Sequence, residues 1–199
     1  MKKRKTHSEL GLPTEEQIQT EMKRIRHTTA YGKALRGTVG VLLVVAAVAV
    51  LISSLFLPVL QIAGDSMTPT LNNNEIVVLI KTNHFETGDL CSFSWNNKIL
   101  IKRIIAGPRD WVEIDGDGTI YVNGEALEEP YVMDKSLGEC DLKFPIQIGE
   151  NEYFLVGDHR STSVDSRSTV IGNVSTEQII GKVVFRIWPF SEIGFIRQK

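Results

Sequence analysis

The sequence predicts a mostly β protein, in which a single N-terminal transmembrane helix precedes an antiparallel domain of folded-sheet or barrel-like form. Residues 38–57 form an uninterrupted run without charge that is long enough to cross a bilayer. After it, short runs rich in β-branched and aromatic residues alternate with turn signals. We therefore expect a segment 1–37, a transmembrane helix 38–58 and a larger domain 59–199.

The formal net charge of −2 hides an asymmetry along the chain. Residues 1–37 hold nine Lys and Arg against four Glu, whereas the remaining residues are acidic overall. A basic head, an apolar span and an acidic body are typical of a membrane-anchored protein and argue against nucleic acid as a partner. The positive-inside rule then predicts a single-pass protein of the cytoplasmic membrane, with the head in the cytoplasm and the larger domain outside.

A helix is predicted before the span. Thr14 with Gln17 three positions on is typical of a capping box. Ile18, Met22 and Ile25 follow at helical spacing among basic residues, which fits either an amphipathic helix on the inner leaflet or a short solvated helix. The basic region and the apolar run are both too long for a cleaved signal peptide.

The body after the span is predicted to be sheet. The strand candidates are 75–80, 90–95, 99–105, 111–114, 119–122, 152–156 and 182–187. One short helix is predicted at 175–180, capped by Ser175. The connection 125–150 has few strand cues, and we interpret it as a lid-like or exposed excursion.

Cysteine and histidine usage limits the cofactor chemistry. Cys91 and Cys140 are too few and too far apart for a zinc site or a disulfide framework. They fit two separate thiols, or a pair in an oxidising compartment. The four histidines are scattered and no metal-ligand spacing is present, so we expect no metal and no organic cofactor.

The first candidate for chemistry is Ser66, in the stretch Gly64–Thr70 a few residues after the span. Gly, Asp, Ser, Thr and Pro are turn-forming residues whatever their function, so a plain loop explains these seven residues as well. A nucleophilic serine would need a base, and the rest of the chain has to supply it.

Lys102 is the candidate base. It lies in the apolar run 99–105, where a period of two places it on one face with Leu100 and Ile104 and directs Arg103 the other way. Burial lowers the pKa of a lysine, and a neutral lysine can accept the proton of a serine hydroxyl. The alternative is an edge strand whose lysine extends to water.

A third candidate is the polar stretch Gly157–Arg167, which holds hydroxyls, acids and arginines with one aliphatic side chain. Asp165 and Arg167 are two residues apart, so an extended chain would place both on one side. Such a cluster can position groups around a site through charge-assisted hydrogen bonds, or it can be a structural loop.

Taken in order, these stretches resemble the boxes of a bacterial type I signal peptidase. The boxes are Gly64–Leu71, Thr87–Asp89, Lys102–Asp110 and Gly157–Arg167, directly after a membrane span. The resemblance covers roughly residues 38–190. It implies a membrane-bound serine endopeptidase that removes N-terminal signal peptides from secreted preproteins and cuts after small residues, with no cofactor.

The resemblance also implies roles for particular residues. Ser66 would be the nucleophile, with its main-chain N–H in the oxyanion hole, and Lys102 would be the general base. The residues that would orient or support this pair are Ser163, Asp158, Asp165 and Arg167. The walls of the pockets for small substrate side chains are assigned to Ile62, Leu100 and Ile101.

Two positions depart from the family pattern. Gly64 stands where some relatives have a serine that completes the oxyanion hole, so the second donor has to be a backbone group or water. His159 replaces the asparagine often found after the Gly-Asp pair. A catalytic His159–Ser66 pair is the corresponding alternative to the Ser-Lys dyad.

Signal peptides of secretory preproteins and the lipid bilayer are the expected partners, with transient contact to the secretion machinery and a monomeric state. One alternative is a non-catalytic relative that assists pilus assembly, but it would lack the serine or the lysine. Another is a peptidase dedicated to a few pilus or biofilm subunits. A self-cleaving serine–lysine regulator would carry a DNA-binding domain where this chain has a span.

Overall fold

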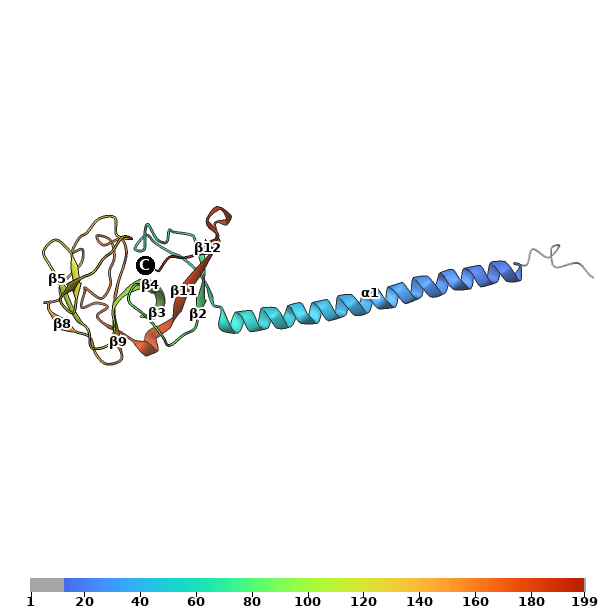
Figure 1. The fold of residues 1–199 in the computed structure, drawn as a ribbon, viewed down its shortest axis with the longest axis horizontal. Helices are drawn as coiled ribbons and strands as arrows, with labels where there is room; N and C mark the ends of the chain where they lie inside the picture. Colours follow the sequence, from blue (N-terminus) through green and yellow to red (C-terminus); the bar gives the residue numbers. More distant parts are fainter. Residues whose placement is uncertain (1–12, 199) are drawn as a thin grey trace, which may run out of the picture. The chain divides into compact units, whose positions relative to one another are not determined.

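The computed structural model describes residues 13–198, apart from some side chains within the helix (Figure 1). The chain divides into two compact units, Met1–Ile52 and Ser53–Lys199, which are described separately. The first unit is built on α1 (Glu15–Phe56), a continuous helix of 42 residues. The Thr14 N–H donates to Gln17 Oε1 at 3.0 Å, which confirms the predicted helix start.

The predicted leading helix and the predicted span are therefore parts of one helix. Within the described residues, a single helical stretch, Tyr31–Ser53, is long and apolar enough to cross a membrane. Its side chains are exposed to the surroundings rather than packed in a protein core. Such a surface fits lipid better than water.

The second unit contains two antiparallel sheets. The larger sheet has the order β1 (Val59–Gln61), β2 (Ile76–Ile80), β11 (Ile179–Trp188), β3 (Leu90–Trp95), β4 (Lys98–Ala106), β9 (Glu152–Val156) and β10 (Val174–Ser175), and β12 (Gly194–Phe195) also pairs with β11 (Figure 1). The smaller sheet has the order β7 (Glu125–Ala126), β6 (Ile120–Val122), β5 (Trp111–Ile114) and β8 (Ile146–Gln147). The predicted mostly β, antiparallel fold is confirmed.

All seven strand candidates are strands, within a few residues of the expected bounds. The helix predicted at 175–180 is wrong: only Thr176–Gln178 form a single 3₁₀ turn, and β11 begins directly after it. The Ser175 N–H donates to Gln178 Oε1 at 2.9 Å, so the capping signal is real but the helix stops after one turn. Ile179 is needed as a strand residue, since it pairs with Phe93 of β3.

The core positions the chain on both sides of Ser66. Ile62, Met67 and Leu71 are buried in one apolar cluster with residues of β2, β3 and β11. Burying large aliphatic side chains contributes about 1.5–3 kcal/mol each. The loop that carries Ser66 is therefore fixed at both ends by apolar packing, although its own sequence is that of a turn.

Candidate active site

Ser66 is half-buried, in a turn between β1 and β2. The Thr68 N–H donates to Asp65 O at 3.0 Å and the Leu71 N–H donates to Met67 O at 2.9 Å, which closes the turn around the serine. Ser66 O accepts a hydrogen bond from the His159 N–H at 3.1 Å. The first and third sequence candidates are thus joined through the main chain.

Lys102 is 4 % exposed, on β4 opposite Cys91 of β3. Its Nζ lies 2.8 Å from Ser163 Oγ, to which it is hydrogen-bonded. The side chain does not reach water, so the alternative of a solvated lysine on an edge strand is wrong. Burial lowers the pKa of Lys102 from its ordinary 10.5 to about 8, with Asp165 opposing the shift and Arg167 adding to it.

Asp165 and Arg167 form a buried ion pair that supports Ser163. Arg167 Nε lies 2.8 Å from Asp165 Oδ1, and Arg167 Nη2 donates to the other carboxylate oxygen and to Ser163 O at 3.3 Å. Asp165 Oδ2 also accepts from the Gly157 N–H at 2.9 Å. The expectation that these two side chains lie on the same side of the chain is confirmed.

Gly157 lets the three segments of the site approach one another. A Cβ at this position would lie 2.2 Å from Ser163 Oγ and 2.6 Å from Ser66 O. Any side chain would therefore push the Ser66 loop and Ser163 apart. The site therefore requires a glycine directly before Asp158.

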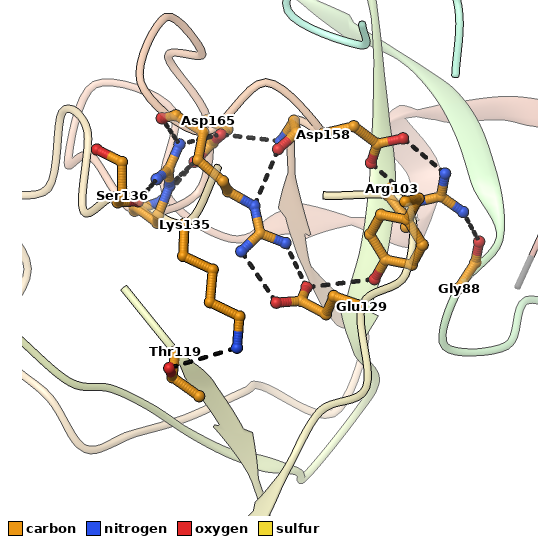
Figure 2. A network of polar contacts seen from close by, with 12 residues as sticks. Gly88, Arg103, Thr119, Glu129, Lys135, Ser136, Asp158 and Asp165 are labelled. Atoms are coloured by element: carbon orange, nitrogen blue, oxygen red, sulfur yellow. Dashed lines mark hydrogen bonds and ion pairs between the residues drawn. The ribbon is translucent and has the colours of Figure 1, made fainter. Parts of the chain in front are cut away.

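Asp158 is buried and binds Arg103, the neighbour of Lys102 in β4. Arg103 Nε and Nη2 lie 2.8 and 2.6 Å from its two carboxylate oxygens. Thr70 Oγ1 donates to the same carboxylate and so connects it to the Ser66 loop. Figure 2 shows Arg103 held between Asp158 and the carbonyl of Gly88.

Sequence reasoning missed a second layer around this loop, formed by residues 127–138. Glu129 and Arg160 form a buried ion pair, and the ring of Tyr131 lies 3.7 Å from Arg103 Cζ (Figure 2). The carbonyls of Ser136 and Leu137 accept hydrogen bonds from Arg167. The connection, which was interpreted as lid-like or exposed, is mostly exposed, and it covers three buried arginines.

The three residues predicted as pocket walls lie around one cavity. Ile62, Leu100 and Ile101 line a cavity of about 110 Å³ together with Ser66 and Lys102. This cavity is smaller than the roughly 300–1,000 Å³ of a typical ligand pocket.

One strand edge beside this cavity is open to a further chain. The ladder between β4 and β9 begins only at Arg103, although β4 starts at Lys98. The side of 98–102 that faces away from β3 therefore carries no strand within the described residues, and an extended peptide could pair there.

The two departures from the family pattern have clear positions. Gly64 has a φ of +97°, and its N–H donates to Asn73 Oδ1 at 3.0 Å, so this N–H is already occupied. Within residues 13–198 no hydrogen bond is made by the Ser66 N–H. His159 Nδ1 lies 4.0 Å from Asp65 Oδ2, so the side chain faces the acid and meets Ser66 only through the main chain.

Neither metal chemistry nor a disulfide is built into the part of the chain that the structure covers. No group of three metal-ligating side chains occurs among those residues. Cys91 is buried and Cys140 is half-buried, and both are free thiols.

The fold and site define a class of protein. A model of the family described as signal peptidase, peptidase S26, matches residues 35–188, and the chain belongs to this family. It is therefore a hydrolase of the serine-protease class, in a family whose activity is signal-peptide removal.

Two relatives in sequence agree with this assignment, and one solved structure is similar over part of the chain. The chain is 37 % identical to signal peptidase IB of Staphylococcus aureus (strain MRSA252) over 155 residues, 67 % of this chain and 79 % of the relative. It is 34 % identical to signal peptidase I S of Bacillus subtilis (strain 168) over 142 residues, 65 % of this chain and 76 % of the relative. A crystal structure of a signal peptidase I from Enterococcus faecalis V583 is 28 % identical with a TM-score of 0.42, covering 50 % of this chain and 96 % of that one.

Proposed function

We propose that the chain is a membrane-bound endopeptidase that removes N-terminal signal peptides from secreted preproteins by a Ser66–Lys102 dyad. One observation carries the proposal: a buried lysine with a lowered pKa lines the same small cavity as a half-buried serine. The non-catalytic alternative is not favoured, since both members of the dyad are present.

The reaction follows from the residue types. Neutral Lys102 takes the Ser66 proton while Ser66 Oγ attacks the scissile carbonyl carbon, and the carbonyl π electrons move onto its oxygen. When the tetrahedral intermediate collapses, the C–N bond breaks and the Lys102 ammonium protonates the leaving amine. Water, deprotonated by Lys102, then attacks the acyl carbon and releases Ser66. No redox or metal step is required.

The oxyanion would be held by the Ser66 N–H, which has no other acceptor among the described residues. Gly64 offers no hydroxyl, and its own N–H is engaged by Asn73. We assign the second donor to water. A fixed protein donor in an oxyanion hole lowers the activation barrier by about 3–4 kcal/mol. A water donor is less preorganised, so it lowers the barrier by less.

The substrate would bind as an extra strand along the open edge of β4 at 98–102. Alternate side chains of an extended peptide point to the same face, so two residues separated by one would both meet the cavity floor. Ile62, Leu100 and Ile101 make that floor apolar and shallow. This supports cleavage after small residues at the first and third positions before the cut.

The dyad is tested by alanine substitution in the full-length protein in detergent or liposomes, with a preprotein as substrate. Ser66→Ala and Lys102→Ala are each expected to lose at least about a thousandfold in kcat, because nucleophile and base act as one unit. Ser94→Ala and Lys143→Ala are matched controls, since both residues are exposed and neither lies on the proposed substrate edge 98–102. Full activity of Lys102→Ala would overturn the dyad.

We also propose that α1 spans the cytoplasmic membrane with residues 1–37 inside and the domain 59–199 outside. The charge asymmetry and the exposed apolar stretch Tyr31–Ser53 support this orientation. A reporter enzyme that matures only outside the cytoplasm is expected to be active when fused after Lys199 and inactive when fused before Met1. The opposite pattern would refute the orientation.

A further inference from the structure

The segment Ile196–Gln198 lies beside β11 at the point where β3 no longer pairs with it. β3 pairs with β11 only as far as Cys91 and Lys182. Beyond that point the Ile196 N–H donates to Val184 O at 3.0 Å, and Gln198 Nε2 donates to Val183 O at 2.8 Å. The segment therefore completes the hydrogen bonding of β11 where the two strands diverge.

The Gln198 amide also reaches across to β3. Its Oε1 accepts a hydrogen bond from the Leu90 N–H at 2.8 Å. Leu90 and Val183 are fully buried, so removal of the amide would leave a buried N–H and a buried carbonyl without these partners. Each such group costs about 1–3 kcal/mol when it is left unsatisfied. The Gln198 side chain thus bridges β3 and β11 by hydrogen bonds.

Through its main chain the same residue meets Arg103. Gln198 O accepts a hydrogen bond from Arg103 Nη1. A guanidinium has five N–H donors, and here each one has an acceptor. The acceptors are Asp158 Oδ1, Asp158 Oδ2, Thr70 Oγ1, Gly88 O and Gln198 O.

Arg103 is the point where the three parts of the site are joined. It follows Lys102 directly in β4, Thr70 lies on the Ser66 loop, and Asp158 opens the loop that carries Ser163. A guanidinium with every donor satisfied has one orientation. Gln198 supplies one of its five acceptors from a fourth segment, residues 196–198, whose Ile196 also packs in the apolar cluster that holds Met67 and Leu71 of the Ser66 loop.

We propose that Gln198 is a positioning residue for signal-peptide cleavage, which fixes Arg103 and so the alignment of Ser66 with Lys102. The proposal rests on the Ser66–Lys102 dyad proposed above. Gln198 does not line the cavity beside Ser66, and its hydrogen bond toward the site goes to Arg103, the residue that follows Lys102 in β4. Its loss should therefore affect the chemical step and leave substrate binding intact.

The test compares Gln198→Met and Gln198→Ala with Arg197→Ala in the full-length protein. Met has nearly the shape of Gln without its hydrogen bonds, and Arg197 is an exposed neighbour. Misplacement of catalytic groups by about 1 Å can cost a hundredfold in rate. We expect kcat to fall about 10-fold or more in both Gln198 variants, with KM within about twofold of wild type, and Arg197→Ala to remain unchanged.

Each outcome decides the proposal. Wild-type kcat in Gln198→Met overturns it, as does a rise in KM without a fall in kcat. Loss of folding in both variants, measured by circular dichroism, would make Gln198 a residue of stability only and would also overturn it. Lys102→Ala in the same assay separates the two hypotheses: if that variant is active the dyad fails, whereas an inactive Lys102→Ala with an unaffected Gln198→Met rejects only the positioning role.

Discussion

Lys102 lies in the middle of β4, and its amine has one hydrogen-bond partner among the described residues, the hydroxyl of Ser163. No carboxylate lies within ion-pair distance of its amine among the described residues. Burying an isolated ammonium group costs free energy, so burial favours the neutral amine and lowers the pKa of Lys102. The nearest charges, Asp165 and Arg167, largely balance each other because they are paired.

The lowered pKa of Lys102 predicts how the rate depends on pH. The base form of the lysine increases as pH rises through about 8, so kcat/KM should rise about tenfold per unit below that value and level off above it. The measurement is kcat/KM for a preprotein between pH 6 and 10, with circular dichroism to confirm folding at each pH. A flat profile would contradict Lys102 as the base.

At the residue level, the sequence predicted what local periodicity can carry. Alternation in β4 placed Lys102 and Arg103 on opposite faces, and the spacing of Asp165 and Arg167 predicted that both lie on one side of the chain, although not that they form an ion pair. It could not show that Arg103 is buried, because its acceptors lie 15 to 95 residues away along the chain. The role of Gln198 was invisible for the same reason.

At the level of elements, long apolar runs were recognised and short ones were not. The strands missed by the sequence analysis, such as β1, β7 and β12, have two or three residues and are defined by a partner strand rather than by their own composition. The helix predicted at 175–180 failed because Ile179 pairs with Phe93 of β3 and both Ile179 and Ile180 belong to β11. Tertiary pairing outweighed a correct capping signal.

The connection between β7 and β8 shows the limit of composition as a guide to burial. It was interpreted as a lid-like or exposed excursion, and most of it is exposed, yet Glu129 is buried against Arg160. A charged residue is buried when its partner is supplied by another segment, and a single stretch of sequence does not contain that information. The cover over the polar loop therefore had to come from the structure.

For the molecule as a whole, the sequence predicted an apolar helix followed by a mostly β domain, and the structure has both. Residues Glu15–Phe56 form one helix, and the second unit is antiparallel sheet. Composition alone separated them, because a charge-free apolar run of this length is typical of a membrane-spanning helix. How the strands are ordered in the sheet could not be read from composition, since β11 lies between β2 and β3, about 90 residues away in sequence.

The burial of Lys102 also sets a cost in thermodynamic stability that the whole fold must offset. Unfolding restores its pKa from about 8 to 10.5, so below pH 8 folding transfers a charged lysine out of water. The penalty is fully present below pH 8 and disappears as pH rises toward 10.5. Lys102→Met should therefore have a free energy of unfolding roughly 2–3 kcal/mol higher than wild type at pH 7, measured by urea titration. This gain in stability should shrink at pH 10. If wild type and Lys102→Met are equally stable at pH 7, burial of the charged lysine carries no measurable cost. If Lys102→Met is more stable, the lysine proposed as the base lowers the stability of the protein that carries it.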